Sequence, residues 1–232
     1  MRRQDLIFAL GAISLFIPFF IFPQLLELYK RYNMDHGMLM SFIKFAVLAT
    51  LGEVIGLRIK TGFYNQPGFG ILPRAVVWGF LGMTVKTAFL IFGAGAPAFL
   101  EYMGLEGASE IIKGGLSPEK ILVAFTISAS LNLFYAPVLM SFHKITDIHI
   151  QNTGGRLRGL FTPIQFAEIF PAINWKVQWD FVFKKTIPLF WIPMQTLNFL
   201  CPPEYQILIA ALLGIVLGVL MALASQKSNN VS

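Results

Sequence analysis

The sequence predicts an all-α integral membrane protein, a bundle of about six spanning helices with short helices at the membrane surface. Two observations support this fold class. Hydrophobic residues make up 56% of the 232 residues and charged residues only 13%, about half the charged share of an average soluble domain. The apolar residues also form long blocks with the charges collected between them, instead of alternating at helical spacing. We therefore expect a single integral membrane domain over residues 1–232.

Six apolar blocks reach or approach the roughly 20 residues that a spanning helix needs. They cover residues 6–28, 38–57, 75–100, 120–140, 186–200 and 205–225. The first block follows a basic start but contains Pro18 and Pro23 and lacks a small-residue cleavage site, so we interpret it as a retained helix and not a signal peptide. The fifth block is short and contains Pro188 and Pro193.

The basic residues predict the orientation of these spans. With both ends of the chain on the cytoplasmic side, twelve of the 18 Lys and Arg residues lie inside and four outside, in agreement with the positive-inside rule. Lys44 and Lys86 lie within spans. The net charge of +6 is thus interpreted as a topology signal and a contact with anionic lipid, not with nucleic acid. Cys201 is the only cysteine, and we expect no metal and no cofactor.

Two of the connections between spans have features of their own. Residues 104–117 are expected to form a short surface helix. Residues 141–185 are expected to be the only long loop, with His143 and His149 in or beside it. Its last part, residues 174–185, begins with Asn174, a residue type that caps helices well. This part suits an interfacial helix that leads into the fifth span.

Three ionisable side chains lie within the spans, where a charge near the bilayer centre costs about 2.5–3.5 kcal/mol. Glu53 shares a helix face with small residues, which predicts that it points into the bundle. Lys86 also lies on a glycine-rich face, close to the midplane, so we expect it to pair with a buried acceptor or to border a wet cavity. Lys44 lies on the opposite side of its helix from Glu53, and its ammonium group is expected to reach the headgroups.

Amide side chains add to this polar layer. Asn132, Gln195 and Asn198 lie at a depth similar to that of Lys86, so three different helices contribute. Two interpretations stay open: interhelical hydrogen bonds that hold the bundle together, or a hydrophilic passage. In the sixth block, Gly214 and Gly218 belong to a strip of small residues, for which packing against the chain's own helices is favoured over dimerisation.

The fifth block resembles the signature of the Mpv-seventeen and peroxisomal-membrane-protein-twenty-two family, which reads Trp-Pro-x-x-Gln-x-x-Asn-Phe-x-x-Val-Pro. Trp191, Gln195, Asn198, Phe199 and Pro203 match it in register. The proline of the signature's second position is displaced by one place, and its valine is replaced by a proline. The match is weaker upstream, so the resemblance covers roughly residues 40–225 and is specific only around the fifth block.

The resemblance implies a small protein of a mitochondrial, peroxisomal or other membrane, in a family usually described as four-spanning. The missing motif elements and the lack of an Arg- and Ser-rich presequence favour a distant bacterial member in the inner membrane. Some family members have been described as weakly selective channels.

The leading hypothesis for function is a pore or solute conduit bordered by the polar layer, with a small solute or ion as its substrate. In it, Lys86 would favour anions. A close variant is a proton-coupled carrier in which Glu53 or Lys86 changes charge. The rival class is a structural or assembly protein whose polar layer is interhelical glue, and a homo-oligomer is compatible with either. An intramembrane lipid enzyme is a weaker alternative, because no phosphate loop, paired-histidine motif or nucleophile elbow is present.

Overall fold

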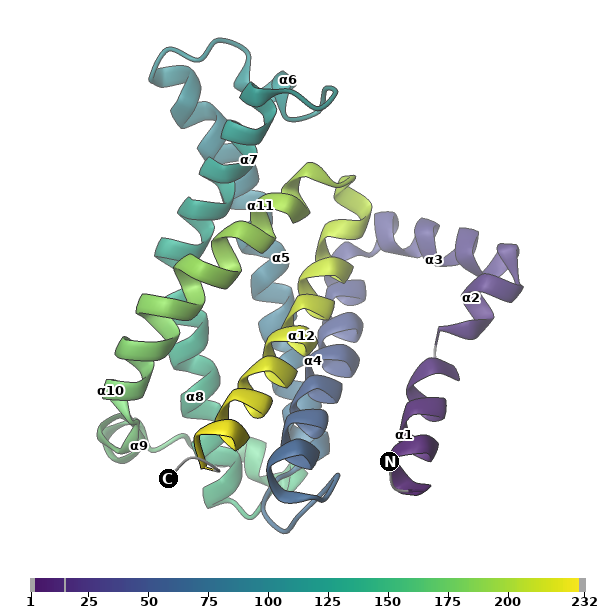
Figure 1. Ribbon diagram of the computed structural model, residues 1–232, viewed down its shortest axis with the longest axis vertical. Coiled ribbons are helices and arrows are strands. Elements are labelled where there is room, and N and C mark those ends of the chain that lie inside the picture. Colours follow the sequence, from purple (N-terminus) through teal and green to yellow (C-terminus); the bar gives the residue numbers. More distant parts are fainter. Residues whose placement is uncertain (1–2, 15, 230–232) are drawn as a thin grey trace. The chain divides into compact units, whose positions relative to one another are not determined.

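The computed structural model describes residues 3–14 and 16–229, with side chains up to residue 220, and all the regular elements among these residues are helices (Figure 1). The chain divides into two compact units, with the boundary between Met40 and Ser41. The polar residues predicted within the spans, from Lys44 to Asn198, all belong to the second unit.

The first unit contains three helices, α1 (Arg3–Ser14), α2 (Ile17–Ile21) and α3 (Pro23–Asp35). Pro18 lies in the first turn of α2, and Pro23 is the first residue of α3. Proline is well tolerated in a first turn, where its missing N–H has no partner in the helix, but it interrupts a helix that precedes it. The predicted span over residues 6–28 is therefore divided among three short helices, and the structure does not confirm it as one spanning helix.

The second unit contains the long helices. These are α4 (Gly37–Thr61), α5 (Ile71–Tyr102), α7 (Pro118–Ser130), α8 (Ala136–Asn152) and α12 (Pro203–Asn229). A π-helical segment, η1 (Leu131–Tyr135), joins α7 and α8 into one continuous helix. Four helices in the described part of the chain are long and apolar enough to cross a membrane: Gly37–Thr61, Ile71–Tyr102, Pro118–Asn152 and Pro203–Leu220. They support an integral membrane protein, whereas the count of six spans is not confirmed.

The predicted fifth block is the end of a longer helical segment made of α10 (Trp175–Val177), η3 (Gln178–Trp191) and α11 (Ile192–Leu200). It begins as predicted, because the Asn174 side chain accepts a hydrogen bond from the backbone N–H of Val177 at 3.1 Å and caps the helix. α11 packs along α7. The Ser128 hydroxyl of α7 donates to the Ile192 carbonyl at 2.7 Å, which joins the two helices.

The prediction of one long loop over residues 141–185 was wrong at its start, whereas the helix predicted over residues 174–185 is present. α8 continues to Asn152, and helical structure resumes at Trp175 and runs through η3. Between them lie the short helices η2 (Leu157–Phe161) and α9 (Phe166–Ala172). Polar side chains of residues 141–152 suggested a loop, but several of them face other helices instead of water. The short surface helix predicted within residues 104–117 is confirmed as α6 (Ala108–Ile111).

Glycines allow the long helices to approach closely. A Cβ added to Gly52 on α4 would lie 3.0 Å from the Cα of Ile215 on α12. A Cβ added to Gly218 on α12 would lie 3.5 Å from the Gly52 carbonyl oxygen. On α5, a Cβ added to Gly82 would lie 2.5 Å from the Cβ of Phe45 on α4. These contacts make α4 the neighbour of both α5 and α12, which run beside it in Figure 1.

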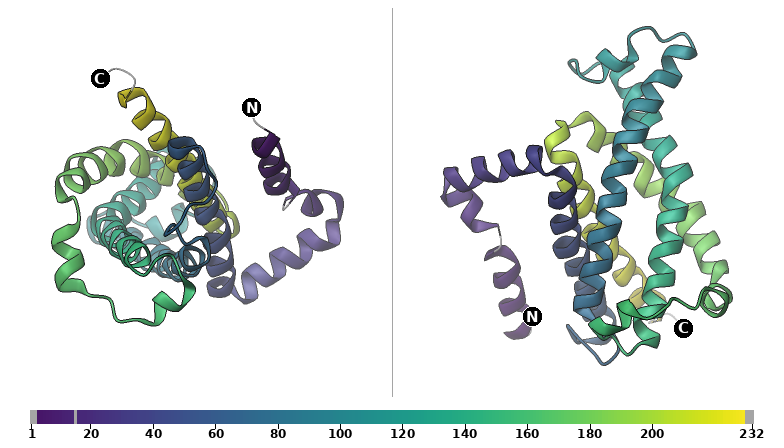
Figure 2. Two further views of the ribbon diagram at one scale, coloured as in Figure 1. Left: turned by 90° about the horizontal axis from the view of Figure 1, so that it is seen from below. Right: turned by 180° about the vertical axis from the view of Figure 1, so that it is seen from behind.

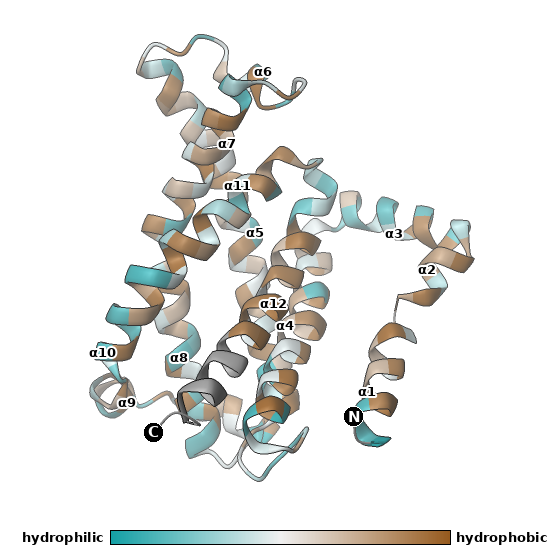
Figure 3. Ribbon diagram, viewed as in Figure 1, coloured by the Kyte–Doolittle hydropathy of each residue, from teal (hydrophilic) through white to brown (hydrophobic). Residues whose placement is uncertain are grey.

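The segment between α8 and η3 curves around one end of this bundle, as the end-on view in Figure 2 shows. Its anchor is a small apolar core in which Ile145 of α8 packs with Ile169 and Ile173. Away from this end, the helices of the second unit are mainly hydrophobic along their lengths (Figure 3). A membrane supplies the apolar surroundings that such outward-facing side chains require.

Candidate functional site

Five side chains from three helices form a charged, hydrogen-bonded group that we call the ion cluster. Its members are Glu53 of α4, Arg74 and Trp78 of α5, and His143 and Asp147 of α8. The Glu53 carboxylate accepts hydrogen bonds from Arg74 Nη1 at 2.6 Å and from Trp78 Nε1 at 2.8 Å, and lies 2.7 Å from His143 Nε2. The cluster therefore ties α4, α5 and α8 together through one carboxylate.

Arg74 is the most connected member of the ion cluster. Its Nη1 donates to Glu53 and also to Asp147, while its Nε donates to the Phe69 carbonyl at 2.7 Å. The guanidinium carbon lies 4.5 Å from the centre of the Phe69 ring. Only 5% of the Arg74 side chain is exposed. A lysine could not replace this residue fully, because the planar guanidinium serves several acceptors in fixed directions.

The ion cluster also resembles a possible cation site, since Glu53, His143 and Asp147 offer ligand atoms within 4.8 Å of one another. However, the Arg74 guanidinium already contacts both carboxylates and supplies positive charge between them. With His143 protonated, two positive groups would balance two negative ones. We therefore interpret the cluster as an internal ion-pair network, in which a metal ion would have to displace Arg74.

The end of the bundle next to the ion cluster is closed by a contact between two loops. Gly70, before α5, has φ +71°, and Gly155, after α8, has φ +70°. A Cβ added to Gly155 would lie 2.8 Å from the Gly70 backbone nitrogen. Both positions thus require glycine for the backbone conformation and for the close approach. His149 Nε2 lies 2.9 Å from the Gly159 carbonyl oxygen and joins α8 to the following segment.

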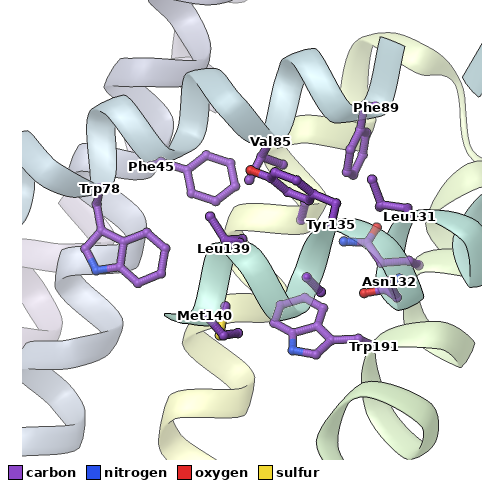
Figure 4. Close-up of a pocket in the computed structure, with 14 residues that line it drawn as sticks. Phe45, Trp78, Val85, Phe89, Leu131, Asn132, Tyr135, Leu139, Met140 and Trp191 are labelled. Atoms are coloured by element: carbon purple, nitrogen blue, oxygen red, sulfur yellow. The ribbon is translucent and has the colours of Figure 1, made fainter. Parts of the chain in front are cut away.

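Farther along the bundle, the helices enclose a cavity of about 70 Å³. Its wall is largely apolar and includes five aromatic residues from four elements, Phe45, Trp78, Phe89, Tyr135 and Trp191 (Figure 4). Among the lining residues that the structure describes, there is no lysine, arginine, aspartate, glutamate or histidine. Trp78 belongs to both regions, because its ring lines the cavity while its N–H donates to Glu53.

Two of the predicted amides, Asn132 and Gln195, line this cavity. Asn132 is 3% exposed and Gln195 4%. The third, Asn198, is not on the wall but donates from Nδ2 to Gln195 Oε1 at 2.7 Å and to the Gln206 carbonyl at 2.9 Å. Its Oδ1 is buried and has no hydrogen-bond partner among the described residues. The structure thus brings the amides together at one place in the bundle.

The two intramembrane lysines lie elsewhere. Lys86 is partly buried on α5 and is not among the residues that line the cavity. Lys44, expected to extend to the headgroups, is only 5% exposed and lies within electrostatic range of Lys86. Its position in the span predicted an exposed ammonium, but the fold covers that side of α4. Neither lysine therefore lines the cavity with the amides.

Two of the five family-signature residues, Trp191 and Gln195, line the cavity. Phe199 of α11 stacks against Phe89 with 4.9 Å between the ring centres. Pro203 is the first residue of α12. The two glycines of the predicted small-residue strip on α12 have different surroundings: Gly214 lines the cavity, and Gly218 packs against α4.

Sequence reasoning missed four members of the ion cluster. Arg74 was interpreted as a topology signal and as a match to an arginine of the family pattern, Trp78 was not considered, and His143 and Asp147 were placed in or beside a loop. A signal was nevertheless present, because Arg74 and Trp78 are four residues apart, as are His143 and Asp147. Pairs with that spacing share a helix face, which would have extended the fourth helix beyond residue 140.

No family model matches the chain, and no curated protein or solved structure matches it. The functional interpretation therefore depends on the geometry of the ion cluster and the cavity.

Proposed function

We propose that this protein is a conduit for a small solute across a membrane, with the amide-bearing cavity as its central chamber and the ion cluster as a gate at one end. The observation that carries the proposal is the cavity itself, which lies inside a helix bundle and has polar groups on an otherwise apolar wall. In this proposal the chain crosses the membrane six times, with residues 6–28 and 186–200 completing the four longer spans.

The position of the cavity supports a chamber near the middle of the membrane. α5 contributes Trp78, Val85 and Phe89 to the wall. At about 1.5 Å per residue, these positions lie from about 10 to about 27 Å along a helix that begins at Ile71. A hydrocarbon core is about 30 Å thick, so this part of α5 corresponds to the interior of the bilayer and not to its surface. An empty, fully apolar packing defect would not need the amides there.

The ion cluster supports a gate because it closes the bundle with interactions that are reversible. It joins three helices that also form the cavity, and Trp78 connects it directly to the cavity wall. A change in the charge of His143 or Glu53 would alter the balance of the cluster and loosen this end. The proton-coupled carrier is the variant of the proposal in which that change accompanies transport.

Distant membership of the Mpv-seventeen and peroxisomal-membrane-protein-twenty-two family belongs to the same proposal, with a bacterial inner membrane as the favoured location. Its support is that Trp191 and Gln195, two of the matched signature residues, lie on the cavity wall. In this proposal, the signature marks the helical segment that lines the chamber.

The test is to fill the chamber. A Cβ added at Gly214 has nothing within 4 Å, so Gly214→Leu places a side chain in the cavity without an immediate clash. Purified protein in liposomes is expected to carry small solutes faster than empty vesicles, as measured by light scattering during osmotic shrinkage and reswelling. Gly214→Leu is expected to reduce this flux to the level of empty vesicles.

The matched control is Val216→Leu, which enlarges an outward-facing side chain of the same helix that is 46% exposed. It is expected to leave the flux unchanged. If the wild-type protein gives no flux above empty vesicles for any solute, the conduit is excluded and the structural interpretation of the polar groups remains.

A further inference from the structure

The amides at the cavity have orientations that backbone carbonyl groups determine. Asn132 Nδ2 donates to the Ser128 carbonyl at 2.9 Å, so its Oδ1 points the other way. Asn198 Nδ2 donates to the Gln206 carbonyl, and the same nitrogen donates to Gln195 Oε1. Gln195 must therefore direct its Nε2 away from Asn198. A carbonyl oxygen can only accept, which makes these assignments chemically determined.

This leaves an acceptor on Asn132 and a donor on Gln195, two residues of the cavity wall, without a partner among the described residues. Within the described part of the chain, Asn132 Oδ1 and Gln195 Nε2 form no hydrogen bond, although both side chains are more than nine-tenths buried. Buried polar groups in native proteins are nearly always paired. A molecule in the cavity would complete both groups if it offered a donor and an acceptor of its own.

The rest of the wall favours an uncharged, planar molecule. The polar ends of Trp78 and Tyr135 point away to partners outside the cavity, Trp78 Nε1 to Glu53 and the Tyr135 hydroxyl to Thr84 at 2.7 Å. Trp78 and Tyr135 therefore contribute their rings to the cavity wall. Figure 4 shows these rings together with Phe45 and Trp191 around the cavity. None of the described side chains on the wall is ionised, so none of them compensates the cost of desolvating an ion.

Volume sets the size of this molecule. A water molecule needs about 10–15 Å³ of cavity volume, and an engineered cavity of about 150 Å³ binds benzene. The cavity of about 70 Å³ thus has room for about five water-sized groups and is less than half as large as the cavity that binds benzene.

We infer that the solute of this chamber is a small, neutral, amide-like molecule of the size of urea, formamide or acetamide. Such a molecule has a planar body, an N–H donor for Asn132 and a carbonyl acceptor for Gln195. The inference depends on the proposed conduit and specifies its substrate class. It also replaces the anion selectivity expected from Lys86, because Lys86 is not on the cavity wall.

The first test compares solutes of equal size and different charge in the liposome assay. Urea is compared with guanidinium, and acetamide with acetate. The neutral member of each pair is expected to pass faster through the wild-type protein. Gln195→Leu and Asn132→Leu are each expected to lower acetamide flux about fivefold, the equivalent of one neutral hydrogen bond. Gln151→Leu, at an exposed position of α8, is the matched control and is expected to have no effect.

The second test measures occupancy without transport. A Trp175→Phe/Trp179→Phe background leaves only Trp78 and Trp191 of the four tryptophans, and both line the cavity. Acrylamide, itself a small neutral amide, is expected to quench their fluorescence, whereas iodide and caesium ions are not. Acetamide is expected to compete with acrylamide in a saturable way, and Gln195→Leu should abolish the competition.

The two tests separate the possible failures. Flux of the charged solutes at least equal to that of the neutral ones would overturn the inference and leave the conduit in place. No flux of any solute, with saturable acetamide competition, would exclude the conduit but support an amide-binding cavity. Absence of competition, as expected for a cavity that holds only water, would overturn the inference whatever the flux.

Discussion

The ion cluster and the cavity use polar side chains in opposite ways. In the ion cluster, the charged groups satisfy one another, and Arg74 alone serves Glu53, Asp147 and the Phe69 carbonyl. At the cavity, the polar groups are uncharged, and Asn132 and Gln195 each retain a hydrogen-bonding atom without a partner in the described chain. Fully paired groups stabilise a fold, whereas unpaired groups can recognise a ligand. The comparison therefore assigns the stability of the closed end of the bundle to the first region and solute binding to the second.

The largest expected effect comes from Arg74→Met, which leaves two carboxylates in the ion cluster without their cation. Removal of one partner from a buried ionic network costs about 3–5 kcal/mol. We expect this loss in the free energy of unfolding, measured as thermal or denaturant unfolding in mild detergent. Arg74→Lys keeps the positive charge but cannot serve the three acceptors in the same directions. Its free energy of unfolding should lie between those of Arg74→Met and the wild type.

Lys60→Met is the control, since Lys60 is exposed near the end of α4 and its replacement should leave the stability unchanged. Equal stabilities of Arg74→Met and Lys60→Met would contradict the role given to the ion cluster.

Trp78→Phe separates the two roles of Trp78, the residue that the ion cluster and the cavity share. It removes the N–H that donates to Glu53 but keeps an aromatic ring at the cavity. A hydrogen bond to a charged group contributes about 1.5–3 kcal/mol, so we expect a stability loss of that size with little change in solute flux. Trp179→Phe, at a side chain that is 57% exposed, should change neither. A large fall in the flux through Trp78→Phe with unchanged stability would contradict the role given to its hydrogen bond with Glu53.

Asn132→Leu tests whether the cavity amides matter for stability. Hydrogen bonds within membrane helix bundles average about 0.6 kcal/mol, and Asn132 donates to Ser128, one turn before it, at the carbonyl (2.9 Å) and more weakly at the hydroxyl (3.5 Å). We expect the unfolding free energy to fall by no more than about 1 kcal/mol, in contrast to the loss of acetamide flux. A loss as large as that of Arg74→Met would make the amides structural glue.

The smallest effect is expected for Ser128→Ala, which removes the hydroxyl that joins α7 to the Ile192 carbonyl. The expected loss is about 0.6 kcal/mol. Thr126→Ala is a close control, because the Thr126 hydroxyl donates to Leu122 within its own helix and is exposed. No difference between the two variants would show that the bond between the helices adds nothing measurable.

The amide group shows how far sequence reasoning reached. Helical spacing put Gln195 and Asn198 on one face, and depth along the spans put Asn132 at a similar level. The structure places the three residues close together, with Gln195 bonded to Asn198. Spacing and depth both follow from the rise and turn of a helix, and so they are accessible from the order of residues alone.

The ion cluster shows where this reasoning fails. Polar residues lower the hydropathy of a segment, so His143 and Asp147 suggested a loop after residue 140. They are helical because Glu53 and Arg74, about 90 and 70 residues earlier in the chain, provide their partners. The error with Lys44 has the same origin, since a helical position specifies a face but not what covers it.

The sequence by itself determined that this protein is helical, that its long apolar segments suit a membrane, and that polar residues occur within them. These properties depend on composition and on spacing along one helix. Only the tertiary structure decided which polar residues meet, because the pairing of Glu53 with Arg74 and His143, or the position of Gly214 on a cavity wall, depends on the register of one helix against another. That register arises from packing between residues distant in the chain, which local periodicity does not contain.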